Sequence, residues 1–248
     1  KTYKMKKLLF LLMIPVLCFG QYTSIPDQYF EQALIDLGHD DIVDGKVITA
    51  SINSLDTLIV TEKSISNLKG IEAFTSLTIL VCVNTQITSL DVSKNTALIE
   101  LHCGHNQLIS LDISHNTALT KLDCRYNQLK SLFVSKNTYP YLARIKCTNN
   151  QLKSLDLSSF IALTSLYCND NQITSLDVSK NTSLTHLYFG DNKLEKLNIS
   201  KNLFLHSLGC ENNQLSKLDI RNNKVLKTLR CDNNKFDCDA IIAKFGFK

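Results

Sequence analysis

The fold class that the sequence predicts is an elongated solenoid with one parallel β-sheet along its inner face. A unit of 21 residues recurs, most clearly as ALIELHCGHNQLISLDISHNT at residues 97–117 and ALTKLDCRYNQLKSLFVSKNT at residues 118–138. Apolar and polar residues alternate over one short stretch of each unit, which is the pattern of a strand with one buried face. Copies of the unit fill most of the 248 residues. Each unit therefore buries its apolar side against its neighbours, and the core grows along one axis.

Residues 1–20 are predicted to form a secretory signal peptide. Lys6 and Lys7 precede the apolar run LLFLLMIPVLCF, and Cys18 and Gly20 place small residues at positions −3 and −1 of a cut before Gln21. The run is too short to span a bilayer as a membrane anchor. We expect the chain to be secreted or displayed at the cell surface, without a transmembrane segment after cleavage.

Residues 21–50 are expected to form an N-terminal helical cap. Ser24 begins a helix start signal in which Pro26 or Asp27 occupies the first turn. An apolar stripe at helical spacing should cover the open end of the first coil; it consists of Tyr29, Phe30, Ala33, Leu34 and Leu37.

About nine repeats are predicted over residues 51–236, following the pattern Leu-x-x-Leu-x-Cys-x-x-Asn-x-Leu-x-x-Leu-x-Val. The sixth position holds Cys82, Cys103, Cys124, Cys147, Cys168, Phe189, Cys210 and Cys231. The ninth position holds Asn106, Asn127, Asn150, Asn171, Asn192, Asn213 and Asn234, and Thr85 replaces this Asn in one copy. We expect each Asn amide to satisfy backbone groups of adjacent coils, and this network to be weaker at Thr85.

The repeat pattern resembles the leucine-rich repeat family, and in particular its short-repeat bacterial forms, such as internalins and secreted leucine-rich proteins of Bacteroidetes. The resemblance covers about residues 25–245. It implies a horseshoe-type α/β solenoid with a concave parallel sheet, extended or single-turn convex segments and helical caps at both ends. The C-terminal cap is expected at residues 237–248, where Asp237 or Asp239 caps a short helix containing Cys238.

The cysteines are predicted to be a column of buried thiols rather than a set of disulfides. Seven of them share one inward position, where parallel strands hold side chains at about the 4.8 Å strand separation, longer than a bridge prefers. Phe189 occupies the same position, as a packing residue can but a bridge partner cannot. Cys231 with Cys238 is the one pair left open as a disulfide, because Cys238 lies outside the column.

No catalytic residue, metal site or cofactor is predicted. His102 and His105 flank Cys103, but alternation sends Cys103 inward and His102 outward. Residues 39–45 faintly resemble a calcium loop, but Ile42 occupies a ligand position, so an Asp-Gly turn is expected there instead. The recurrent Asp91, Asp112, Asp156, Asp177 and Asp219 are interpreted as turn residues on the convex side.

The outward strand positions are the predicted binding surface, because packing does not fix their identity. Tyr and Arg are favoured interface anchors. The candidate ligand-binding residues, which gather in the middle of the sheet, are Lys121, Arg125, Arg144, Lys146, Tyr167 and Tyr188. We expect them to bind an acidic or glycan-bearing partner; the alternative is a solvated face whose charges have no specific partner.

A second candidate surface lies where the repeat is irregular on the convex side. It comprises Phe133, Tyr139, Tyr141 and Phe160. These aromatic residues are expected to pack on each other more readily than to form a docking site, although a second binding site remains an alternative.

The predicted function is that of a non-enzymatic, bacterial surface or extracellular binding module for a protein or glycoprotein. Without the four lysines of the first twenty residues, 23 basic residues balance 23 acidic ones, so no electrostatic footprint for nucleic acid remains. A monomer is expected. The alternatives are a structural or adhesive spacer without a specific partner and, less favoured, an accessory of a secreted hydrolase.

Overall fold

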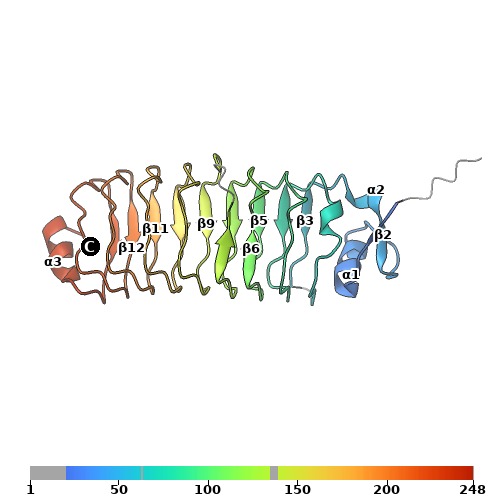
Figure 1. The fold of residues 1–248 in the computed structure, drawn as a ribbon, viewed down its shortest axis with the longest axis horizontal. Coiled ribbons are helices and arrows are strands. Elements are labelled where there is room, and N and C mark those ends of the chain that lie inside the picture. Colours follow the sequence, from blue (N-terminus) through green and yellow to red (C-terminus); the bar gives the residue numbers. More distant parts are fainter. Residues whose placement is uncertain (1–20, 63, 135–138, 248) are drawn as a thin grey trace, which may run out of the picture.

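The computed structural model describes residues 21–62, 64–134 and 139–247, and the predicted signal peptide lies outside them. The chain forms an elongated stack of coils, with helices at both ends (Figure 1). Among the described residues, no helix is long and apolar enough to cross a membrane.

One parallel sheet of nine strands runs the length of the stack, as predicted. Its strands, in spatial order, are β3 (Thr57–Ile59), β4 (Ile79–Val81), β5 (Glu100–His102), β7 (Lys121–Asp123), β9 (Arg144–Lys146), β10 (Ser165–Tyr167), β11 (His186–Tyr188), β12 (Ser207–Gly209) and β13 (Thr228–Arg230). Each strand pairs with its neighbour at equivalent repeat positions, for example Leu166 with Leu187. The repeat pattern therefore also fixes the register of the sheet.

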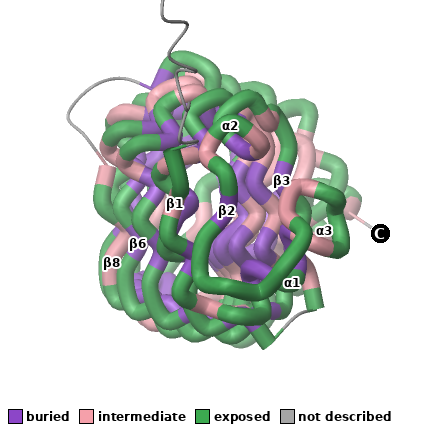
Figure 2. The backbone as a smooth tube through the Cα atoms, turned by 90° about the vertical axis from the view of Figure 1, so that its right-hand side faces the viewer, coloured by how far each residue is buried: buried purple, intermediate pink, exposed green. Residues whose placement is uncertain are grey.

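The core lies between this sheet and the return segments (Figure 2). The leucine at the centre of most strands is buried, as are all seven cysteines of the column. A fully buried leucine contributes about 2 kcal/mol to folding. Phe189 is buried in the cysteine column, which confirms that this position serves packing.

The asparagines at the ninth position bind neighbouring coils as predicted. The Nδ2 of Asn171 donates to the carbonyls of Cys147 and Cys168 at 3.0 and 3.2 Å, and its Oδ1 accepts from the Leu152 N–H at 3.0 Å. Thr85 has no such amide: its hydroxyl lies 2.6 Å from Asn106 Oδ1 and 3.3 Å from the Cys82 carbonyl, both outside the preceding coil. The network is weaker there, as expected.

The convex return segments are mostly irregular turns. The carboxylates of Asp91, Asp112, Asp156, Asp177 and Asp219 each accept a hydrogen bond from the backbone N–H two residues later. This confirms their interpretation as turn residues. Two return segments also pair as a short parallel sheet of β6 (Ser110–Asp112) and β8 (Ser131–Phe133), which the sequence did not predict.

A second column of asparagines lies buried on the return side. Its members are Asn95, Asn116, Asn181, Asn202 and Asn223. Each Nδ2 donates to two carbonyls of the preceding coil, as Asn202 does to Val178 and Asn181 at 3.1 and 2.9 Å. Tyr139 and Phe160 take this position in the two coils between Asn116 and Asn181.

The N-terminal region contains more than the predicted helix. β1 (Tyr22–Ser24) pairs antiparallel with β2 (Lys46–Ile48), while α1 (Gln28–Asp36) and α2 (Thr49–Ile52) flank them, followed by the 3-10 turn η1 (Ile71–Ala73). Asp27 is the N-cap of α1 rather than a first-turn residue. The predicted apolar stripe is too wide: Tyr29 and Leu37 are 49% and 45% exposed, so only Phe30, Ala33 and Leu34 of the stripe are buried.

Glu31 binds the loop of residues 39–45, whose sequence faintly resembles a calcium loop. It is buried, and its Oε1 accepts hydrogen bonds from the backbone N–H groups of Asp44, Gly45 and Lys46 at 3.0, 2.7 and 2.9 Å. Gly45 has a φ of 84°, which suits a glycine in a turn. The carboxylate therefore ties α1 to the start of β2.

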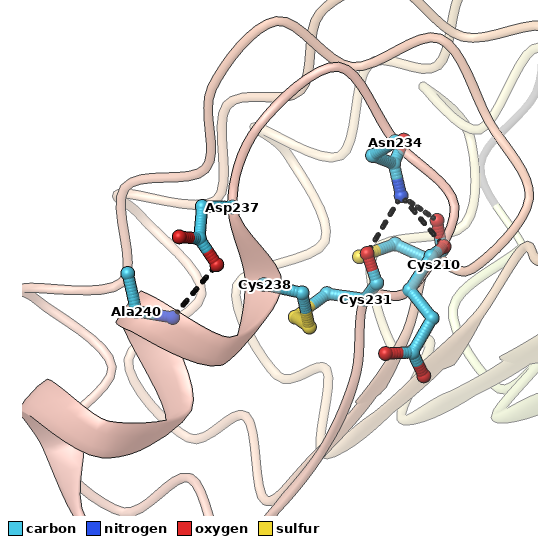
Figure 3. Close-up of a disulfide and its surroundings, with 7 residues drawn as sticks. Cys210, Cys231, Asn234, Asp237, Cys238 and Ala240 are labelled. Atoms are coloured by element: carbon cyan, nitrogen blue, oxygen red, sulfur yellow. Dashed lines mark hydrogen bonds between the residues drawn. A yellow bond between two sulfur atoms is a disulfide. The ribbon is translucent and has the colours of Figure 1, made fainter.

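The C-terminal helix α3 (Cys238–Phe245) begins at the N-cap Asp237, whose side chain accepts from the Ala240 N–H at 2.9 Å. Cys231 and Cys238, the one pair that the sequence left open, form a disulfide (Figure 3). Cys238 approaches from the helix, outside the column, so strand spacing does not restrict this pair. Six cysteines of the column remain free: Cys82, Cys103, Cys124, Cys147, Cys168 and Cys210.

Candidate binding surface

The sheet register brings the predicted binding residues together on four consecutive strands. Lys121 lies beside Arg144 across β7 and β9, and Lys146 lies beside Tyr167 across β9 and β10. Tyr167 is in turn aligned with Tyr188 on β11. Arg125 follows the end of β7. All six predicted residues therefore belong to one continuous area, which we call the central patch.

Two of the four cations of the central patch are neutralised by neighbouring carboxylates. The Nζ of Lys121 lies 2.6 Å from Glu100 Oε1. The Nε of Arg125 lies 3.2 Å from the Oδ1 of Asp123, which is buried. Hydrogen bonds from Lys121 and His102 lower the pKa of Glu100, which keeps that carboxylate charged. These pairs reduce what Lys121 and Arg125 can contribute to ligand binding.

Arg144 and Lys146 keep their charge available. Within the part of the chain that the structure describes, no salt bridge involves either side chain. The Nζ of Lys146 lies 6.0 Å from the centroid of the Tyr167 ring, within range of a cation–π contact. Strand β9 is therefore the positively charged part of the central patch.

The rings of Tyr167 and Tyr188 form a flat platform beside these cations. Their centroids are 5.3 Å apart and their planes differ by 9°. Gly209 leaves room for the second ring, since a Cβ at this position would lie 2.5 Å from Tyr188 Cδ1. The platform therefore depends on a glycine in the next strand.

A shallow depression of about 310 Å³ lies within the central patch. It is lined by Arg125, Tyr126, Arg144, Lys146, Thr148 and Tyr167. Sequence reasoning missed Tyr126, which follows the alternating positions and has a left-handed φ of 54°. The equivalent residues of other coils, such as His105 and Asp170, also have positive φ and are exposed, so they form a third row of outward side chains. In the sequence this row is the residue directly before each ninth-position Asn. The rings of Tyr126 and His105 stack, with their centroids 4.4 Å apart.

The irregular aromatic residues on the return side do not form one cluster. Tyr139 and Phe160 are buried and in contact, with ring centroids 5.1 Å apart, as expected. Phe133 and Tyr141 are 53% and 64% exposed, so the prediction that they join the cluster is wrong. Tyr139 and Phe160 are too buried to contact a partner.

The polar groups near Cys103 are engaged in other contacts. His102 Nε2 lies 3.0 Å from Glu100 Oε2, while Cys103 is buried in the column. Within residues 21–62, 64–134 and 139–247, no three His, Cys, Asp or Glu side chains are arranged to hold a metal ion.

Comparisons with known proteins agree with this architecture. Residues 161–203 match the family described as Leucine Rich repeats (2 copies). The chain is similar to the functional domain of InlJ from Listeria monocytogenes, which includes a cysteine ladder, with 27% identity and a TM-score of 0.55 over 87% of this chain and 58% of that domain. A leucine-rich repeat protein of Leptospira interrogans is 26% identical, with a TM-score of 0.61 over 71% of this chain and 48% of that protein.

Internalin C2 from Listeria monocytogenes shares the fold, with 20% identity and a TM-score of 0.63 over 90% of this chain and 94% of that one. A comparison with curated protein sequences finds no match. Of the InlJ domain and the Leptospira protein, by contrast, the chain spans only about half the length, 58% and 48%.

Proposed function

Because the chain is a leucine-rich repeat protein, we propose that it is an exported, non-enzymatic module that binds a protein or glycoprotein partner through the concave sheet. Leucine-rich repeat solenoids typically serve as protein interaction modules, but a repeat fold alone does not identify the partner. The choice of surface rests on the side chains of this chain.

The observation that carries the proposal is the combination of free cations and a stacked aromatic pair. Arg144 and Lys146 have no carboxylate partner among the described residues, and they lie next to the Tyr167–Tyr188 platform. Aromatic and Arg side chains contribute disproportionately to protein interfaces because they bury large areas at a low entropic cost. A face that only contacts solvent would not require a glycine at position 209 to make room for the Tyr188 ring.

The experiment is affinity capture with the purified chain, followed by titration of the captured partner against variants. We expect Arg144→Ala with Tyr167→Ala to weaken binding at least 100-fold, since each such anchor contributes about 2 kcal/mol. The matched control is Lys153→Ala with Tyr141→Ala, which removes an exposed cation and an exposed aromatic ring outside the patch.

Unchanged affinity in the double variant would place the binding surface elsewhere. Failure to capture any saturable partner would favour the spacer alternative, whereas turnover of a substrate would favour the hydrolase accessory.

Export is checked by N-terminal sequencing of chain recovered from culture medium: Gln21 as the first residue supports it, and retention of residues 1–20 contradicts it. A molar mass of one chain in light scattering supports the proposed monomer.

A further inference from the structure

The concave face changes sign across the Tyr167–Tyr188 platform. The free cations Arg144 and Lys146 lie on one side of it. Asp170 and Asp191 are exposed in the coils of the platform itself, three residues after Tyr167 and Tyr188. Beyond the platform, Glu211 and Asp232 follow β12 and β13, with Arg230 between them in sequence. Asp170 and Asp191 occupy equivalent positions of adjacent coils, and burial together with the Asp191 charge raises the pKa of Asp170. The mature chain is near neutral, yet this surface is strongly polarised.

Glu211 is the best defined acidic group on this side. Its side chain is 19% exposed, and the nearest cation, Arg230 Nη1, is 3.9 Å from its Oε1. Its Oε2 is buried and has no hydrogen-bond partner among the residues that the structure describes, so a ligand would reach this carboxylate through Oε1. A Cβ added at Gly190 would lie 2.9 Å from Glu211 Cδ, so glycine makes room for this carboxylate next to the aromatic platform. The negative charge is thus held in place and incompletely compensated.

The two charged regions are separated by a distance that suits a short peptide. Arg144 and Lys146 lie on β9, and Glu211 follows β12, three strands further along the sheet. Neighbouring strands are about 4.8 Å apart, which gives a span of roughly 14 Å. An extended chain advances about 3.3 Å per residue, so about four residues bridge the two regions.

Charge of both signs discriminates between classes of ligand. Nucleic acids, acidic glycans and anionic lipid surfaces present negative charge throughout, and would meet repulsion over Asp191 and Glu211. A polypeptide can carry an acidic and a basic residue at a defined spacing. Its intervening side chains can lie on the Tyr167–Tyr188 rings.

Building on the proposed function, we propose that the concave face recognises an extended peptide segment of a protein partner. The segment places an acidic residue over Arg144 and Lys146 and a basic residue, about four positions away, over Glu211. The residues between them pack on the tyrosine platform. The segment runs across the strands, along the solenoid axis.

The test is selection of displayed random 12-residue peptides on the immobilised chain, with counter-selection on an Arg144→Glu/Glu211→Lys variant. Enriched peptides should carry an acidic and a basic residue three to five positions apart. For a synthetic consensus peptide, Arg144→Glu and Glu211→Lys should each weaken binding at least tenfold. Lys153→Glu, an exposed control outside the patch, should leave affinity unchanged. The charge-swapped double variant should prefer a charge-swapped peptide.

Enrichment of acidic peptides without a basic residue would overturn the inference, as would affinity that is insensitive to Glu211→Lys. Absence of enrichment over the counter-selected variant would do the same. Circular dichroism and Glu211→Gln, which removes only the charge, separate misfolding from lost recognition. A captured partner that is sensitive to Arg144→Ala but not to Glu211→Gln would retain the proposed function and reject the peptide of mixed charge.

Discussion

The Tyr139 hydroxyl donates a hydrogen bond of 2.9 Å to the Ile113 carbonyl in the preceding coil. Asn116 makes the equivalent bond one coil earlier, from its Nδ2 to the Val92 carbonyl at 3.0 Å. A phenol therefore replaces an amide in the buried column, and its ring fills the space next to Phe160.

We expect Tyr139→Phe to destabilise the chain by about 1 kcal/mol, the value of one buried hydrogen bond, because the Ile113 carbonyl keeps its bond from the Asn116 N–H. Urea unfolding measures this change. Tyr141→Phe, at an exposed ring, should stay within about 0.5 kcal/mol. Equal effects of the two substitutions would show that the Tyr139 hydroxyl adds nothing to stability.

Asn171→Ala should cost about 3 kcal/mol in unfolding free energy. The substitution removes the acceptor for the buried Leu152 N–H and a donor to the Cys147 carbonyl. Asn222→Ala is the control, since that side chain is exposed and makes one long contact of 3.4 Å. A loss below about 1 kcal/mol would mean that the coils relax to restore these bonds.

Stability should fall as the pH rises above about 8.5. Burial raises the pKa of Cys82, Cys147 and Cys210 to about 12. The unfolded chain releases these protons near pH 8.5 and the folded chain does not, so each thiol lowers the unfolding free energy by about 1.4 kcal/mol per pH unit above that value. Unfolding curves between pH 7 and 10 measure the slope, which Cys147→Ala should reduce. An unchanged slope in this variant would contradict the assignment.

Thiol titration checks the disulfide. In denaturant without reductant, a chain that starts at Gln21 should show six reactive thiols, and eight after reduction. In the folded chain, the buried column should react with none of the reagent at neutral pH. Eight thiols before reduction would show that Cys231 and Cys238 are not bonded.

Gly209→Ala should displace the Tyr188 ring, because the new Cβ would lie 2.5 Å from Tyr188 Cδ1. We expect about 1 kcal/mol of destabilisation and the loss of Tyr188–Tyr167 ring contacts in NMR spectra. Ser207→Ala, in the same strand, should leave both unchanged. Persistence of the ring contacts in Gly209→Ala would show that the platform does not need the glycine.

The periodic part of the fold could be predicted from the sequence because one repeat pattern determines both which side chains are buried and how neighbouring strands align. Leu101 and Cys103 are buried and alternate with the half-buried Glu100 and His102, and their spacing recurs in the next coil. The antiparallel pair of β1 and β2 could not be predicted, because neither strand belongs to a repeat, α1 lies between them in the sequence, and the start of β2 is held by the buried Glu31 carboxylate.

The central patch could be placed from the sequence because alternation separates outward from inward side chains. Its electrostatics could not. The pairing of Lys121 with Glu100 and of Arg125 with Asp123 depends on side-chain conformation. Tyr126 was missed because it lies in a left-handed turn, where the period of two no longer applies. The platform also depends on Gly209, whose role is visible only beside Tyr188.

The substitution of Asn by Thr85 has a mechanical consequence. At the ninth position of the later copies an amide joins successive coils, as Asn213 does through the carbonyls of Phe189 and Cys210. Among the described residues, the coils of β3 and β4 are joined by an amide on the return side alone, that of Asn95. Tension applied along the axis loads these links in series, so the first rupture should occur where a link is missing. That place is the junction of β3 with β4. Under force we expect the first coil to separate from the stack, while the coils that carry Arg144 and Tyr167 stay folded and remain bound to a ligand.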